Sequence, residues 1–287
     1  MISLNKLLIK ERFIKMKITK KGYLIAVDLD GTLLYGMNGK DQLAFDLLKE
    51  IAKTNYVIIS TGRPLRGSIN YYNELELTTP IINYNGAIVQ NPKDKSFPKK
   101  MVTVNKDYII DIFDNNRDYF ENIFSEIEDD IYLYKYQTEI DAYLHMNNGT
   151  IHLGELHDTL KEDTNGAIGF LKKGTFSRID EYVKRKYPKE LLVRYWPHPT
   201  LDVIEIYSPK TSKGDALKSI IDYYHVPFEK TISIGDGHND LDMFEVTCVN
   251  VAMGNSHEEL IANSNYLTKN VDENGVYHYL INEFIDK

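Results

Sequence analysis

Short apolar runs rich in β-branched residues alternate with stretches of helical spacing in two separate parts of the chain. Runs with the length and composition of buried strands occupy residues 23–28, 56–60, 81–83, 231–234 and 249–252. Helical spacing follows at 41–54 and 213–224, and further helices are predicted near 240–244, 258–262 and 276–284. Strands that alternate with helices favour an α/β fold with a doubly wound, Rossmann-like parallel sheet.

The alternation stops between residues 86 and 208. This segment is richer in Tyr, Asp and Glu, and it contains strand-like runs at 131–136, 166–171 and 201–207. It therefore has the pattern of an inserted α+β domain. We predict an α/β core formed by residues 17–85 and 209–287, an α+β cap formed by 86–208, and an N-terminal extension formed by 1–16.

The overall charge and the single cysteine limit the classes of partner and compartment. The 287 residues carry a formal net charge of −8, which argues against nucleic acid as the main partner. The apolar runs are all shorter than the roughly 18 residues of a membrane span, so we expect no stable membrane association. Cys248 is the one cysteine, so an intrachain disulfide cannot form, which suits a reducing cytoplasm. We expect a cytoplasmic protein.

The first predicted strand ends abruptly in two carboxylates. In "YLIAVDLDGTLL" the apolar run leads into Asp28 and Asp30, with Gly31 and Thr32 directly after them. Ionised carboxylates beside buried apolar surface are costly unless something pairs with them. A calcium-binding loop is a poor alternative, because the following "TLLYG" lacks the oxygen ligands that such a loop needs and a strand precedes the motif.

A second group of acidic residues follows another predicted strand. "SIGDGHNDLDMF" contains Asp236, Asn239, Asp240 and Asp242. The carboxyl ends of parallel strands lie at one edge of a sheet, so these acids and Asp28 are expected to converge. Two carboxylates about 4 Å apart repel each other by roughly 4 kcal/mol at an effective dielectric constant near 20. The convergence predicts a bound cation, and the hard oxygen ligands favour Mg²⁺.

Other residues at these strand ends can bind phosphate. "VIISTGRP" places Thr61 and Gly62 after a strand, where a hydroxyl and backbone N–H groups can hold phosphoryl oxygens. Lys213 in "TSKGDAL" can neutralise phosphate charge, although a lysine in the first turn of a helix is usually solvated. Arg63 either contacts the rest of the substrate or braces the cap, and Asn85 in "NYNGA" either faces the site or caps the turn.

The sequences "DLDGT", "STGR", "SKGDAL" and "GDGHND", in this order, resemble the four motifs of the haloacid dehalogenase superfamily. More narrowly they resemble its Cof-type phosphatases, which carry a large α+β cap of type IIB between the second and third motifs. The resemblance extends from about Tyr23 to the end of the chain. It implies a phosphatase that uses Mg²⁺.

The resemblance also implies a role for each matching residue. Asp28 would be the nucleophile that forms an aspartyl-phosphate, and Asp30 would be the general acid and then the general base. The metal would be held by the Asp28 carboxylate, the Asp30 backbone carbonyl and Asp236, with Asp240 steadying the metal's other ligands. The residues that would hold the phosphoryl group are Thr61, Gly62, Lys213 and Asn239.

The leading hypothesis is a Mg²⁺-dependent phosphatase that acts on a small phosphorylated metabolite, with sugar phosphates as the favoured class. One alternative is a phosphomutase on the same core, which would return the phosphoryl group to a substrate hydroxyl. A second alternative is a non-catalytic phosphate-sensing protein. Turnover of a generic aryl phosphate distinguishes an enzyme from a sensor, and release of inorganic phosphate distinguishes a phosphatase from a mutase. The sequence leaves the oligomeric state, monomer or dimer, open.

Overall fold

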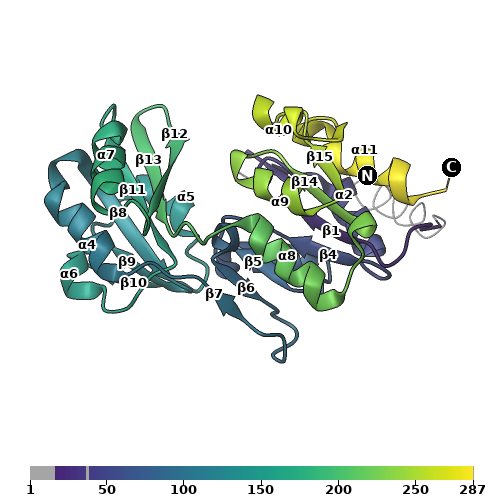
Figure 1. Ribbon diagram of the computed structural model, residues 1–287, viewed down its shortest axis with the longest axis horizontal. Helices are drawn as coiled ribbons and strands as arrows, with labels where there is room; N and C mark the ends of the chain where they lie inside the picture. Colours follow the sequence, from purple (N-terminus) through teal and green to yellow (C-terminus); the bar gives the residue numbers. More distant parts are fainter. Residues whose placement is uncertain (1–16, 37–38, 287) are drawn as a thin grey trace, which may run out of the picture. The chain divides into compact units, whose positions relative to one another are not determined.

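The structure, a computed structural model, describes residues 17–36 and 39–286 and divides into two compact units (Figure 1). The first unit, which we call the core, consists of the described residues of Met1–Gly62, Ile69–Lys99 and Ser212–Lys287. The second unit, which we call the cap, consists of Arg63–Ser68 and Lys100–Thr211. The predicted N-terminal extension, residues 1–16, lies outside the described residues.

The core is built on a five-stranded parallel sheet with the order β16-β15-β14-β1-β4. Its strands are β1 (Leu24–Val27), β4 (Tyr56–Ile59), β14 (Thr231–Gly235), β15 (Val249–Ala252) and β16 (Tyr266–Leu267). Strand β1 is buried along its whole length, and Val27 pairs with Ile234 on one side and with Ile59 on the other. The segments that follow β1, β4 and β14 therefore start side by side at one edge of the sheet.

Helices flank this sheet, as the alternating pattern predicts. They are α2 (Gln42–Ile51), α8 (Lys213–Tyr224), α9 (Leu241–Val246), α10 (Glu258–Ala262), α11 (Gly275–Phe284) and the part of α3 (Leu65–Glu74) that begins at Ile69 and belongs to the core. Leu217 and Ile220 of α8 and Met243 of α9 share an apolar cluster with Leu24 of β1 and Ile58 of β4. Burial of this cluster fixes α8, and with it Lys213, against the sheet.

Four short core strands depart from the parallel sheet. The strands β2 (Leu34–Tyr35) and β3 (Gly39–Lys40) form a small antiparallel hairpin. The predicted strand at 81–83 forms as β5 (Ile81–Asn83), but it pairs antiparallel with β6 (Ile88–Gln90) in a separate small sheet. An isolated parallel bridge between Ser60 and Ile82 connects it to the end of β4. Its place in the main parallel sheet was therefore predicted wrongly.

The cap contains a six-stranded sheet with the order β10-β9-β8-β11-β13-β12. Its strands are β8 (Phe120–Ile127), β9 (Asp130–Leu133), β10 (Thr150–Leu153), β11 (Gly166–Lys172), β12 (Leu192–Pro197) and β13 (Leu201–Tyr207), and β7 (Lys100–Met101) precedes them. Its helices are α4 (Lys106–Asn115), α5 (Asp141–Leu144), α6 (Leu156–Thr159) and α7 (Phe176–Lys186).

Apolar residues on the two faces of the cap sheet form separate clusters. Ile112 of α4 and Ile179 of α7 pack with Ile123 of β8 on one face, which makes a helix-covered core. Phe124 and Leu144 belong to the other cluster. The predicted fold class, an α/β core with an inserted α+β cap, is confirmed. Among the described residues, the helices are too short or too polar to cross a bilayer.

Candidate active site

The predicted acidic and phosphate-binding motifs lie at the carboxyl ends of three adjacent core strands. Asp28 follows β1, Thr61 follows β4 by one residue, and Asp236 follows β14. The backbone N–H of Asp28 donates to the carbonyl of Ile234 at 3.0 Å, which continues the β1–β14 pairing by one residue. Asp28 is thus fixed at the rim of the sheet, where open α/β sheets bind their ligands.

A buried lysine joins two of the carboxylates. Nζ of Lys213 lies 2.7 Å from Oδ1 of Asp28 and 2.6 Å from Oδ1 of Asp240. Lys213 is only 1% exposed. It is the first residue of α8, and Ser212 caps that helix by accepting a hydrogen bond from the backbone N–H of Asp215 at 3.0 Å. A buried lysine requires partners, so Lys213 is not the solvated lysine that its position in the sequence would usually indicate.

The loop after β14 holds Asp240 in a fixed orientation. Oδ2 of Asp240 accepts hydrogen bonds from the backbone N–H groups of Asp236 and Gly237, at 3.0 and 2.9 Å, while Oδ1 faces Lys213. Asp240 is 1% exposed. Because the loop, the lysine and the carboxylate fix one another, this side of the site is arranged before any substrate arrives.

Burial and mutual repulsion raise the pKa values of these acids. Burial raises the pKa of Asp28 well above its ordinary value against the opposing effect of Lys213. Burial, together with the charge of Asp240, raises the pKa of Asp236 to about 7. The pKa of Lys213 is raised as well, because the attraction of Asp240 and Asp28 outweighs its burial. The single lysine stays charged but does not balance the carboxylates around it.

This excess of negative charge fits a divalent cation. Asp28, Asp236 and Asp240 each offer a carboxylate oxygen, and these oxygens lie within 4.8 Å of one another. A set of hard oxygen donors with excess negative charge is the chemistry that Mg²⁺ prefers. Three of the predicted acids, Asp28, Asp236 and Asp240, therefore converge, and their oxygen donors suit the predicted metal. Asp242 was expected to converge with them but is not part of this group, and its carboxylate accepts a hydrogen bond from the hydroxyl of Ser212. The metal ligand assignments stay predictions.

Glycine at position 31 lets the turn after Asp28 approach the acidic cluster. Gly31 has a φ of +83°, and a Cβ atom there would lie 2.1 Å from Oδ2 of Asp236. The hydroxyl of Thr32 donates to Oδ1 of Asp236 at 3.0 Å. A side chain at position 31 would thus displace Asp236, which explains why the motif places glycine directly after Asp30.

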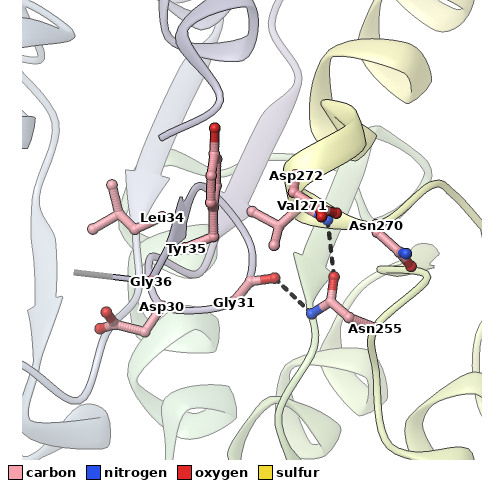
Figure 2. A pocket seen from close by; sticks show the side chains of 9 residues that line it. All are labelled: Asp30, Gly31, Leu34, Tyr35, Gly36, Asn255, Asn270, Val271 and Asp272. Atoms are coloured by element: carbon pink, nitrogen blue, oxygen red, sulfur yellow. Dashed lines mark hydrogen bonds between the residues drawn. The ribbon is translucent and has the colours of Figure 1, made fainter. Parts of the chain in front are cut away.

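Asp28 and Asp30 differ in exposure. Asp28 is 5% exposed, whereas Asp30 is exposed and lies on the tight turn in which Gly31 N–H donates to the Leu34 carbonyl at 2.8 Å. Figure 2 shows the Asp30 carboxylate pointing away from Asn255. An exposed carboxylate can exchange protons with solvent, which suits the predicted acid and base role.

The predicted phosphate-binding residues Thr61, Gly62 and Asn239 meet at Asn85. Thr61 is fully buried, and its carbonyl accepts a hydrogen bond from the backbone N–H of Asn85 at 3.1 Å. Nδ2 of Asn239 donates to Oδ1 of Asn85 at 2.9 Å. A Cβ atom on Gly62 would lie 3.1 Å from the same oxygen. Asn85 thus orients Asn239, while its direct contact with substrate stays a prediction.

Two residues that flank the predicted phosphate-binding motifs, Gly86 and Arg63, make contacts that support the local structure. Gly86 has a φ of +103°, and a Cβ there would lie 2.1 Å from the carbonyl of Ser212, so the "NGA" turn packs directly on the start of α8. Nη1 of Arg63 donates to the carbonyl of Gly67 at 3.3 Å, and Arg63 groups with the cap. The predicted contact of Arg63 with substrate stays a prediction.

A cavity of about 690 Å³ borders Asp30 on the side of the β2–β3 hairpin (Figure 2). It is lined by Asp30, Gly31, Leu34, Tyr35, Gly36, Asn255, Asn270, Val271 and Asp272. The sequence reasoning missed Asn255, although "VAMGNS" follows a predicted strand of the same sheet and so reaches the same edge. The position of Asn255 shortly after that predicted strand was the signal that could have identified it.

Comparisons with known proteins agree on one family. The family described as haloacid dehalogenase-like hydrolase matches residues 25–280. The chain is 35% identical to the 5-amino-6-(5-phospho-D-ribitylamino)uracil phosphatase YitU of Bacillus subtilis, over 91% of this chain and 97% of the relative. A haloacid dehalogenase-like hydrolase from Bacteroides thetaiotaomicron has a similar structure, with a TM-score of 0.78 at 22% identity over 92% of this chain and 100% of that one. A sugar phosphatase of subclass IIB has a TM-score of 0.74 at 20% identity over 91% and 98%.

Proposed function

The chain belongs to the haloacid dehalogenase-like hydrolases, and from that premise we propose that it is a Mg²⁺-dependent phosphatase for a small phosphomonoester, working through an aspartyl-phosphate on Asp28. The observation that carries the proposal is the buried network in which Lys213 contacts both Asp28 and Asp240. Enzymes place such preorganised charges where charge develops during reaction.

The proposed reaction has two steps. A carboxylate oxygen of Asp28 attacks phosphorus while the bond to the leaving oxygen breaks, and Asp30 gives that oxygen its proton. Asp30 then takes a proton from a water molecule that attacks phosphorus, which breaks the bond to Asp28 and releases inorganic phosphate. Lys213 neutralises charge beside Asp28 throughout.

The chain's own residues supply the rest of the site. Asp28, Asp236 and the backbone carbonyl of Asp30 would hold Mg²⁺, with Asp240 beside them, and the bound cation would neutralise phosphoryl oxygens. Thr61, Gly62 and Asn239 would orient the phosphoryl group through a hydroxyl, a backbone N–H and an amide. The cap would then select the leaving group, because the core contacts only the phosphoryl group that all substrates share.

For the substrate, we propose 5-amino-6-(5-phospho-D-ribitylamino)uracil as the first compound to test. The support is the similarity to the Bacillus subtilis relative that is named for this substrate, over nearly the full length of both chains. Sugar phosphates are the second class. A panel that contains both classes and a generic aryl phosphate separates them by kcat/KM, and a preference for one of the sugar phosphates would contradict the first choice.

The reaction is tested by phosphate release with and without chelator. We expect EDTA to abolish release and Mg²⁺ to restore it, and activity that persists in EDTA would contradict the metal requirement. Asp28→Asn should lose both turnover and covalent phosphate labelling, because an amide cannot form the acyl-phosphate. Asp222→Asn is a matched control, since Asp222 is exposed on α8 and pairs with Lys218. Conversion of substrate to an isomer without phosphate release would instead identify a mutase.

A further inference from the structure

Asn255, in the loop after β15, connects three segments around the acidic cluster, and Figure 2 shows its contacts with two of them, at Gly31 and Val271. Its Nδ2 donates to the carbonyl of Gly31 at 2.9 Å and lies 3.3 Å from Oδ2 of Asp236. Its Oδ1 accepts a hydrogen bond from the backbone N–H of Val271 at 2.9 Å. Both ends of this one amide are therefore engaged, although the residue is exposed.

The carboxylate of Asp236 is held from two sides. Thr32 donates to Oδ1 at 3.0 Å, and Asn255 approaches Oδ2 at 3.3 Å. The missing side chain of Gly31 leaves the space in which Oδ2 lies. Rotation of this carboxylate would break at least one of the two contacts, so Thr32 and Asn255 together fix the direction of its lone pairs.

The same amide holds the turn that carries Asp30. The carbonyl of Gly31 is the acceptor for Asn255, and the N–H of Gly31 closes the turn onto Leu34 at 2.8 Å. Asn255 thus links the Asp30–Gly31 turn to Asp236, two groups that the proposed Mg²⁺ site must hold at a fixed separation. Val271 anchors the other end of the link.

We propose that Asn255 is a positioning residue for the divalent cation, acting through Asp236 and the Asp30–Gly31 turn. The proposal rests on the Mg²⁺ site of the proposed function. Hydrogen-bond partners of metal-binding carboxylates orient the ligand, and their removal typically costs 10- to 100-fold in metal affinity. Since Asn255 is exposed, its loss removes orientation with little loss of packing.

The test is Mg²⁺ binding by isothermal titration calorimetry for the wild type, Asn255→Ala and Asn255→Leu. We expect both variants to bind Mg²⁺ at least tenfold more weakly than the wild type, and to recover kcat to within a few-fold at saturating Mg²⁺. In EDTA, their melting temperatures should stay within a few degrees of the wild type. The leucine variant keeps most of the side-chain volume but makes no hydrogen bonds. Equal Mg²⁺ affinities in the two variants would therefore show that the lost hydrogen bonds, and not lost packing, cause the weaker binding.

Asn263→Ala is the matched control, because Asn263 is also exposed and its Nδ2 donates to a backbone carbonyl, that of Glu259, at 2.8 Å. Its Mg²⁺ affinity should equal that of the wild type. If the wild type binds Mg²⁺ and both Asn255 variants bind it with the same affinity, this inference is overturned and the proposed function stays intact. Absence of Mg²⁺ binding by the wild type would overturn the proposed metal site as well. A large loss of melting temperature in EDTA would show a purely structural role and also overturn the inference.

Discussion

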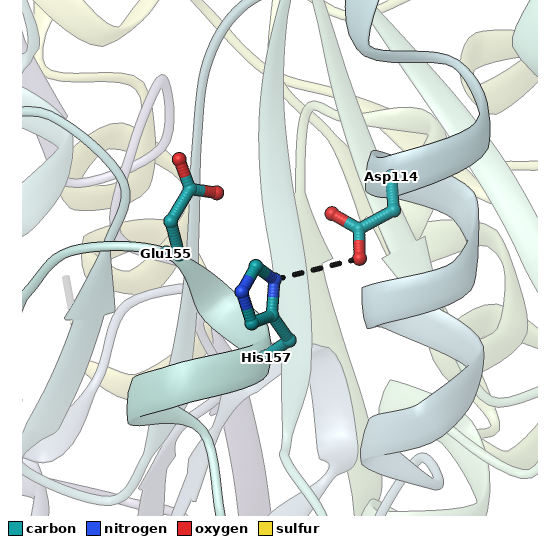
Figure 3. A group of neighbouring side chains, drawn as sticks. All are labelled: Asp114, Glu155 and His157. Atoms are coloured by element: carbon teal, nitrogen blue, oxygen red, sulfur yellow. Dashed lines mark ion pairs between the residues drawn. The ribbon is translucent and has the colours of Figure 1, made fainter.

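Two groups of side chains within the described residues have atoms close enough to hold a metal ion, one in the core and one in the cap. The core group is Asp28, Asp236 and Asp240, and the cap group is Asp114, Glu155 and His157 (Figure 3). In both groups the nearest oxygen or nitrogen atoms lie within 4.8 Å of one another. The two groups differ in burial. Two of the core acids are buried, whereas Asp114 and His157 in the cap are exposed.

The two groups also differ in the cations that the protein supplies. In the cap, Arg117 donates to both carboxylate oxygens of Glu155, at 2.9 and 2.6 Å, and to Asp114 at 2.9 Å. Its hydrogen bonds to Glu155 lower the pKa of that carboxyl. In the core, Lys213 is hydrogen-bonded to the two buried acids, Asp28 and Asp240. The pKa of the third acid, Asp236, is raised to about 7. A close group of acids indicates a metal when burial makes its charge costly and the chain's own cations leave that charge unbalanced.

The largest expected effect comes from removal of the core cation. Lys213→Met should lower kcat/KM by about 10³-fold or more for all substrates alike, because the buried charge beside Asp28 and Asp240 is lost. The measurement is steady-state kinetics on at least two unrelated phosphomonoesters. Lys218→Met is the control, since Lys218 lies on the same helix and makes an exposed pair with Asp222. A loss confined to one substrate would indicate that Lys213 acts on the leaving group.

The geometry of parallel strands explains why much of this site was predictable. Asp28, Thr61 and Asp236 follow strands whose carboxyl ends must share an edge, so apolar runs alone predicted that they converge. Lys213 was different. Its position in the first turn of a helix is typical of a solvated lysine, so the residues alone made it only a weak candidate for neutralising phosphate charge, and the resemblance to a family strengthened that role. Its burial depends on how α8 packs on the sheet, which local sequence does not show.

The elements were predicted best where local signals are strong. The helix predicted at 213–224 coincides with α8, whose N-terminus Ser212 caps, and the helix predicted at 258–262 coincides with α10. The role of β5 was mistaken because its antiparallel partner β6 lies only a few residues further along the chain. The apolar residues of a strand do not indicate which other strand it pairs with. Asn255 was missed for a similar reason, since its partner Gly31 is 224 residues away.

A buried acid outside both groups extends the comparison to pH. Asp41 is fully buried at the start of α2, where it accepts hydrogen bonds from the backbone N–H groups of Ala44 and Tyr277, and burial raises its pKa to about 6. The folded protein therefore holds this proton more tightly than the unfolded chain does. The resulting stabilisation is complete below about pH 3.8 and is lost as the pH rises through about 6.

Replacement of Asp41 by asparagine should remove this pH dependence. Between pH 5 and pH 7.5, the free energy of unfolding of the wild type should fall by about 1.4 kcal/mol relative to Asp41→Asn, as the buried carboxyl ionises. Urea unfolding of both proteins in EDTA at the two pH values measures the difference. Asp46→Asn, on the same helix, serves as the control. Equal pH dependence in wild type and Asp41→Asn would show that Asp41 does not titrate in this range.

A smaller effect is expected from removal of the cap cation. Arg117 is partly exposed, so Arg117→Met should cost about 1 kcal/mol of unfolding free energy through lost pairing with Glu155 and Asp114. Its contact with the ring of Phe113, 4.5 Å from the centroid, adds to this loss. The loss should shrink in high salt, because exposed ion pairs are screened. Activity per folded molecule should not change, and a large loss of kcat would contradict the purely structural role of the cap group.

The smallest effect should come from His157, the residue that gives the cap group its resemblance to a metal site. His157 is exposed, and its Nδ1 lies 3.6 Å from Oδ2 of Asp114, which already pairs with Arg117 (Figure 3). His157→Ala should therefore change the free energy of unfolding by less than about 0.5 kcal/mol. The number of Mn²⁺ ions bound per chain, counted by titration with electron paramagnetic resonance, should stay the same as in the wild type. Loss of one ion in this variant would show that Arg117 does not suffice to balance the cap acids, and that exposure alone does not distinguish the two groups.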